Sequence, residues 1–253
     1  MPLNTIANVI AAIDAVVQEC IATQNKEGYF AALYKRMTIA VNEGICEGAF
    51  EDGARMEKLD VCFAERYLQA WQCYGHQQPC SASWQCAFDS TKSNHLTVIQ
   101  HLILGINTHI NLDLAIAAAT VCRGNAIHAL EKDFNNINNL IASLVDDIQC
   151  CLEQVWFPMR IIDRVANRGE QAVLNFSINV ARRAAWSNAV YLAKANKADQ
   201  QHYIYEMDTM VKLLAQKIQS PGCFISLLLR AIRAAEYDDV RRTIKLIDTT
   251  VVN

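Results

Sequence analysis

HLILGINTHINLDLAIAAATVC, residues 101 to 122, is the stretch of sequence that decides the fold. It forms most of a predicted helix from Asn94 to Cys122, which is apolar on nearly every side. A helix without a continuous polar face is typical of a domain interior. We therefore expect an all-α, bundle-like domain in which the other helices pack around this central one.

Amphipathic stretches on both sides of the central helix supply the surrounding layer. Apolar residues recur at helical spacing in each of them, which predicts helices at about 4–28, 29–41, 52–74, 133–158, 159–167, 170–195, 200–218 and 224–247. Gly75 and Pro79 predict a loop over residues 75–83. No Pro/Gly/Ser-rich tract or charge block divides residues 1–253, so we expect a single domain.

Charge and composition argue against several classes of partner. The net charge of −3 gives no basic surface for nucleic acid. No run of 18 or more apolar residues lacks polar interruption, so we expect no membrane span. The N-terminus lacks the pattern of a secretory signal, and the ten cysteines contain no C-x-x-C. We therefore expect a cytoplasmic protein with reduced thiols, whose partner is a small-molecule substrate or a hydrophobic ligand.

Polar side chains interrupt the central helix at regular spacing. His101, His109 and Asp113 follow one side of the helix, while Asn107 and Asn111 follow another. A buried amide or imidazole without a hydrogen-bond partner costs about 1–3 kcal/mol. We therefore expect these side chains, together with Asp60 from another helix, to form one polar pocket.

His109 and Asp113, at i and i+4, are candidates for two kinds of chemistry. The pair can bind one divalent metal ion, such as Zn, Mn or Fe, with Asp60 as a further ligand. Alternatively, Asp113 orients the His109 ring for acid–base catalysis. His101, about 12 Å away along the helix at about 1.5 Å per residue, is a candidate for a second proton-transfer group.

The remaining pocket residues have expected supporting roles, and a structural alternative exists for the whole set. Asn107, Asn111 and Trp186 are candidates for substrate binding. In the alternative, Asp60 forms a salt bridge with Arg182 or Arg183, and the polar strips are a network that fixes helix register.

Four groups of residues carry a family resemblance. The chain resembles the uncharacterised domain-of-unknown-function family 5995 over roughly residues 28 to 235, in the segments around Met56–Ala70, His101–Leu114, Asp133–Asn138 and Ala181–Trp186. The resemblance implies one coherent, mostly helical domain and brings no established activity.

A second, local similarity is to the helical zinc phospholipase C and single-strand nuclease group. Proteins of that group bind three metals through His-x-x-x-Asp or His-x-x-x-Glu pairs, and His109 with Asp113 is similar to one such pair. This chain has six histidines, no N-terminal Trp ligand and no second buried pair, so the similarity implies one or two metals at most.

These observations lead to three functional hypotheses. The first is a small-molecule enzyme, in its metal-dependent form a hydrolase with an activated water. The second is a non-catalytic binding or scaffold protein with a hydrophobic ligand cavity. The third is a metal-free acid–base cyclase or isomerase of a biosynthetic pathway.

Overall fold

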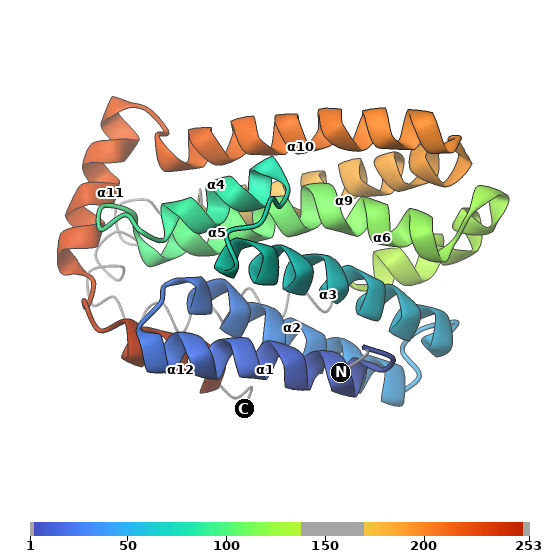
Figure 1. Cartoon of the computed structure of the whole chain (residues 1–253), viewed down its shortest axis with the longest axis horizontal. Helices are drawn as coiled ribbons and strands as arrows, with labels where there is room; N and C mark the ends of the chain where they lie inside the picture. The colour runs from blue at the N-terminus through green and yellow to red at the C-terminus, as the bar shows by residue number, and fades with distance from the viewer. Residues whose placement is uncertain (1–2, 138–169, 250–253) are drawn as a thin grey trace.

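The computed structural model describes residues 3–137 and 170–249, which form ten α-helices, one π-helical turn and one 3-10 helix and contain no strand (Figure 1). The all-α prediction is confirmed. The elements are α1 (Ile6–Thr23), α2 (Glu27–Cys46), α3 (Gly53–Gly75), α4 (Ala82–Ser90), α5 (Val98–Thr108), η1 (His109–Asp113), α6 (Leu114–Val121), η2 (Gly124–Leu130), α9 (Glu170–Lys194), α10 (Lys197–Gln219), α11 (Cys223–Ala235) and α12 (Val240–Thr249).

The central helix is confirmed, with a later start than predicted. α5, η1 and α6 follow one another without interruption, and other helices pack along this rod: α2, α4 and α10 against α5, and α3 and α9 against α6. The rod begins at Val98 because Thr97 caps it: the Thr97 hydroxyl accepts from the backbone N–H of Gln100, whose side chain accepts from the N–H of Thr97.

Within residues 3–137 and 170–249, two helices are long and apolar enough to cross a membrane: Ile6–Thr23 and the rod Val98–Val121. Of the most apolar window of the rod, 78% is buried inside the molecule, as in the core helix of a bundle. The corresponding share for Ile6–Thr23 is 33%, because its outer face is exposed. The absence of a membrane span therefore stays a prediction.

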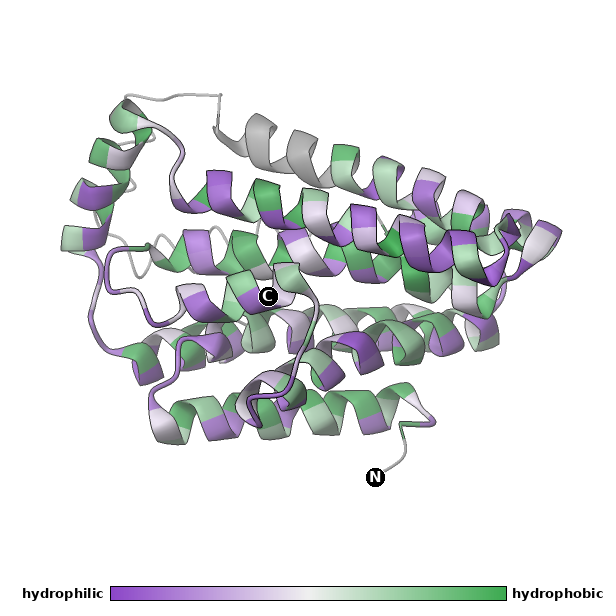
Figure 2. Ribbon diagram, turned by 45° about the horizontal axis from the view of Figure 1, so that its top comes forward, coloured by the Kyte–Doolittle hydropathy of each residue, from purple (hydrophilic) through white to green (hydrophobic). Residues whose placement is uncertain are grey.

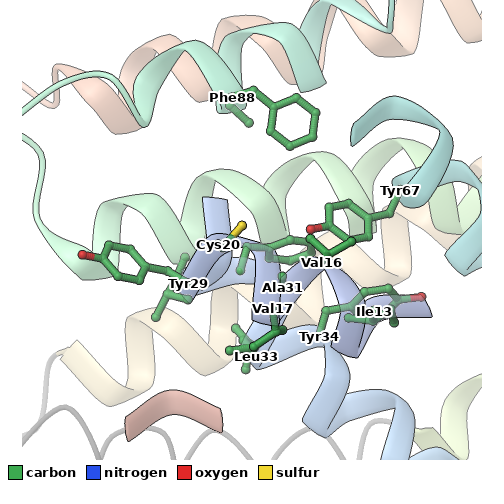
Figure 3. Packing of buried hydrophobic residues seen from close by; sticks show 14 of the residues in the cluster. Ile13, Val16, Val17, Cys20, Tyr29, Ala31, Leu33, Tyr34, Tyr67 and Phe88 are labelled. Atoms are coloured by element: carbon green, nitrogen blue, oxygen red, sulfur yellow. The ribbon is translucent and has the colours of Figure 1, made fainter. Parts of the chain in front are cut away.

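Buried side chains form two apolar clusters along the rod. One joins α1, α2, α3, α4, α5, α10 and α12, and the other joins α3, η1, α6, η2, α9 and α10. Tyr29 and Tyr34 lie on opposite sides of the first cluster (Figure 3). The surface helices carry hydrophobic and hydrophilic residues on different faces (Figure 2), so burial of the apolar faces holds the bundle together.

The structure differs from the prediction in two helical regions. Helix α4 follows the predicted loop and was not predicted; both Ser81 and the distant Asp208 accept hydrogen bonds from its first backbone N–H groups. The single helix predicted at 224–247 is two helices, because residues 236–239 are not helical. Residues 131–137 are helical, and the rest of the two helices predicted over 133–167 lies outside the described residues.

Gly105 lies where Phe30 of α2 packs against the rod. A Cβ atom at this position would overlap the ring of Phe30 and lie 2.9 Å from the Phe30 Cβ. Alanine gains about 1 kcal/mol of helix propensity over glycine, but overpacking costs about 1–3 kcal/mol. We therefore expect Gly105→Ala to lower the free energy of unfolding by about 1 kcal/mol, measured by urea denaturation.

Gly75 provides the matched control for this prediction. It is also helical, and a Cβ there would have no neighbour within 4 Å. Gly75→Ala should leave the free energy of unfolding unchanged or raise it. If Gly105→Ala is as stable as Gly75→Ala, the close approach of Phe30 does not constrain this position.

Candidate functional site

A π-helical turn lies in the middle of the rod and carries the predicted His–Asp pair. In η1, the backbone N–H of Leu114 bonds to the carbonyl of His109, five residues earlier. Such a turn contains one residue more than an α-helical turn, and single π-turns inside α-helices are frequent at functional sites. His109 is its first residue and Asp113 its last.

Three donors converge on the buried carboxylate of Asp113. Nδ1 of His109 lies 3.1 Å from Oδ2, and the indole Nε1–H of Trp84 donates to the same oxygen at 2.8 Å. Nε of Arg66 donates to Oδ1 at 2.8 Å as an ion pair. Because an ionised carboxylate can only accept hydrogen bonds, the proton of the neutral imidazole lies on Nδ1. Nε2 of His109 therefore carries the lone pair.

The ring of His109 is held rigidly by aromatic neighbours. Phe63 stacks on it with ring centroids 3.5 Å apart and planes 9° apart, and Tyr34 meets it edge-on at 4.4 Å. The imidazole is 3% exposed. Burial lowers its pKa, and the hydrogen bond to Asp113 opposes that effect only in part. His109 is therefore a neutral base at physiological pH.

The ring lines a cavity of about 110 Å³ between α2, α3 and the rod, called here the His109 cavity. Most of its wall is apolar. The lining residues are Phe30, Leu33, Tyr34, Met37, Thr38, Val41, Met56, Leu59, Asp60, Phe63, Ile106, His109, Ile110, Leu114, Ile137 and Arg182. Among the described residues, Nε2 of His109 is buried without a hydrogen-bond partner.

Asp60 is a second titratable group on the same wall. It lies on α3 one turn before Phe63, and its buried Oδ2 has no hydrogen-bond partner among the described residues. Burial, and secondarily the charge of Glu57, raises the pKa of Asp60 to about 7. The predicted alternative was a salt bridge from Asp60 to Arg182 or Arg183. Such a salt bridge does not supply a hydrogen-bond partner to Oδ2.

The prediction of one pocket shared by all the polar residues is wrong. His101 lines a separate pocket with Lys26 and Arg233. Gly105 is the reason: it admits the ring of Phe30, whose centroid lies 5.7 Å from that of His109, between the two histidine positions. Asp60 and His109 do share a cavity, and Asp113 lies behind the His109 ring.

The predicted substrate-binding residues also lie elsewhere. Nδ2 of Asn107 donates to the carbonyl of Val211 on α10 at 3.0 Å, and Asn111 donates to Asn107 at 3.0 Å. This pair of amides holds α10 against the rod. It agrees with the alternative in which the polar residues form a network that fixes helix register. Trp186 packs on Phe134 with ring centroids 5.0 Å apart and does not line the cavity.

Sequence reasoning missed Arg66, and it gave Trp84, Tyr34 and Phe63 no part in holding the dyad. A buried carboxylate requires a cation or several donors, so Asp113 itself was the signal that such partners exist. The identity of these partners could not be predicted from the sequence, because Arg66 and Trp84 lie on helices far from Asp113 in the chain.

The residues present do not fit the predicted metal site. Both oxygens of Asp113 are engaged by Arg66, Trp84 and His109. In the described ranges, 3–137 and 170–249, no group of three or more His, Cys, Asp or Glu side chains could hold a metal ion. The contact that the structure does show is a hydrogen bond between Nδ1 of His109 and Oδ2 of Asp113.

The fold and the site define an all-α protein with a buried histidine–aspartate pair beside an apolar cavity. Residues 6–221 match the model of a Family of unknown function (DUF5995), and the chain belongs to this family. The match covers the helices that build the cavity. No curated protein and no solved structure shows significant similarity to the chain.

Proposed function

We propose that the protein is a metal-free acid–base enzyme, an isomerase or cyclase, that acts on a small and mostly apolar substrate in the His109 cavity. One observation carries the proposal: a neutral imidazole with its proton fixed by Asp113 has a buried lone pair without a partner at an apolar cavity. A histidine that served packing alone would leave this acceptor unsatisfied at a cost of about 1–3 kcal/mol.

The two titratable groups of the cavity suit opposite halves of a proton transfer. Nε2 of His109 removes a proton from a carbon next to a substrate carbonyl, while the carboxylic acid of Asp60 donates its proton to the carbonyl oxygen, which gives an enol. In a β,γ-unsaturated ketone this enol is a dienol, so return of the proton from the imidazolium to the γ carbon, and of the hydroxyl proton to Asp60, yields the conjugated isomer. The cycle is redox-neutral and needs no co-reactant.

Asp113 and Arg66 stabilise the charged state of this cycle. When His109 takes up a proton, the imidazolium faces the Asp113 carboxylate at 3.1 Å. When His109 is neutral, the positive charge of Arg66 balances the negative charge of Asp113. The carboxylate is therefore not left as an unpaired buried charge. The aromatic clamp of Tyr34 and Phe63 keeps the ring in position throughout.

Hydrogen–deuterium exchange tests the proposal without knowledge of the natural substrate. The protein is incubated in D2O with cyclohexanone or 2-cyclohexenone, and deuterium at the carbon next to the carbonyl is followed by NMR. We expect exchange above the buffer rate, lost by at least tenfold in His109→Gln, within the range of general-base catalysis. His101→Gln, on the same helix but in another pocket, should retain it.

The same experiment separates the second candidate, a binding protein for a hydrophobic ligand, which the apolar lining of the cavity favours. Saturable binding of both ketones, detected by shifts of cavity methyl signals, without any enzyme-dependent exchange supports the binding protein and contradicts the enzyme. An exchange rate that is the same in His109→Gln as in the wild type also contradicts the enzyme proposal.

A further inference from the structure

A second pocket, of about 620 Å³, lies at the N-terminal end of the rod. It is called here the His101 pocket and is lined in part by Lys26, Tyr29, His101, Arg233, Glu236 and Asp238. Figure 1 shows that the start of α2, the start of α5 and the link between α11 and α12 lie at the same end of the molecule. The proposed reaction in the His109 cavity uses none of these residues.

His101 gives this pocket a buried hydrogen-bond acceptor. The hydroxyl of Ser90 donates its proton to the carbonyl of Ala87 at 2.6 Å, so toward Nδ1 of His101, 3.5 Å away, the Ser90 oxygen can only accept. The ring proton is therefore on Nδ1, and Nε2 carries the lone pair. The side chain is 5% exposed, and Nε2 has no partner in the described part of the chain. A ligand with an N–H or O–H group would satisfy it.

The wall of the His101 pocket is held by specific hydrogen bonds. Nζ of Lys26 donates to the carbonyl of Ser93 at 2.6 Å and to the side chain of Asn94 at 2.9 Å. Nε of Arg233 donates to the carbonyl of Asn94 at 3.1 Å, and Glu236 accepts from the backbone N–H of Val98 at 2.8 Å. The loop before α5 is thus fixed from two sides, which gives a preformed site.

The charges around the pocket balance one another. Its charged lining residues are two cations, Lys26 and Arg233, and two anions, Glu236 and Asp238. Arg233 pairs with Asp238 at 2.6 Å and lies 3.6 Å from Glu236. Burial, with repulsion from Lys26 and Arg233, lowers the pKa of His101 to about 3, so the ring stays neutral. No surplus charge favours an anion or a cation, and a neutral ligand fits best.

We propose that the His101 pocket binds a small, neutral, polyhydroxylated molecule of the sugar or polyol class. One hydroxyl donates to Nε2 of His101, and a neighbouring hydroxyl accepts from Lys26, whose ammonium group has three donors of which two are engaged within the protein. Hydroxyl groups suit such a site because each can both donate and accept. The ring of Tyr29, 5.9 Å from that of His101, forms an apolar wall.

The test is an NMR titration of protein with ¹⁵N-labelled histidine, using glucose and myo-inositol as probes. We expect a saturable shift of the Nε2 signal of His101, with a Kd of about 1 mM or tighter, and no shift at His109. His101→Phe and, as a second variant that leaves the ring in place, Lys26→Met should each weaken binding at least tenfold. His109→Gln is the matched control and should bind as the wild type does.

Three results would overturn the proposal. The first is the absence of a saturable shift with either probe. The second is a response of the Nε2 signal to sodium phosphate or zinc chloride and not to the polyols, which would assign an anion or metal site. The third is unchanged polyol binding in folded His101→Phe and Lys26→Met proteins. None of these outcomes bears on the exchange reaction of the His109 cavity.

Discussion

Replacement of Asp113 by alanine is expected to lower the free energy of unfolding by about 3–5 kcal/mol. The substitution removes the acceptor shared by Arg66, Trp84 and His109. The side chain of Arg66 is 32% exposed and can turn toward water. The buried N–H groups of Trp84 and His109 have no such alternative, and each unsatisfied donor costs about 1–3 kcal/mol.

Urea denaturation followed by far-UV circular dichroism measures this loss. Asp89→Ala is the control, because that carboxylate is 49% exposed and belongs to a surface ion pair; we expect a change below about 1 kcal/mol there. Asp113→Asn, which keeps one acceptor oxygen, should fall between the two. A loss below about 1 kcal/mol in Asp113→Ala would mean that the three donors find other partners.

Asp60 is expected to make the protein less stable as the pH rises from 4 to 7. Burial raises its pKa to about 7 in the folded protein, against an ordinary value of 3.8 for an aspartate. Between these values the native state binds more protons than the unfolded state, so the free energy of unfolding decreases with pH. Above pH 7 the penalty is complete, on the order of 4 kcal/mol at 1.36 kcal/mol per pKa unit.

The measurement compares the wild type with Asp60→Asn, since other carboxylates also titrate in this range. The amide is similar in shape and does not ionise. The two proteins should have about the same free energy of unfolding at pH 4. From pH 4 to pH 7 the free energy of unfolding of the variant should become increasingly larger than that of the wild type, and it should still be larger at pH 8. Asp238→Asn, at a carboxylate that is 87% exposed, is the control for the loss of a carboxylate as such. A constant difference between wild type and Asp60→Asn from pH 4 to 8 would contradict a raised pKa.

The sequence was sufficient for features that depend on local pattern. The all-round apolar character of residues 94–122 predicted the central rod, which the structure has at Val98–Val121, and the spacing of His109 and Asp113 predicted a pair in contact. Asp60 was placed on the right cavity because a carboxylate on an apolar stripe must lie in the interior. These inferences need only the periodicity of one helix.

Features that depend on contacts between distant segments were not predictable in this way. The separation of His101 from His109 depends on Phe30, which inserts at Gly105, and the start of α4 depends on Asp208 from α10. The π-turn is a further case, because it has the composition of the surrounding α-helix. Arg66 and Trp84 reach Asp113 from two other helices, so their roles require the tertiary structure.

The π-turn also restricts how the length of the rod can vary. Each residue of an α-helix rotates the following side chains by about 100°, and η1 contains one residue more than a regular turn. Deleting that residue would leave a regular α-helical turn in which Leu114–Val121 still face α3 and α9, but His109 and Asp113 would then be three residues apart. The chain length between His109 and Asp113 thus sets the contact of the dyad, while the π-turn takes up the additional residue and preserves the packing surface of the second half of the rod.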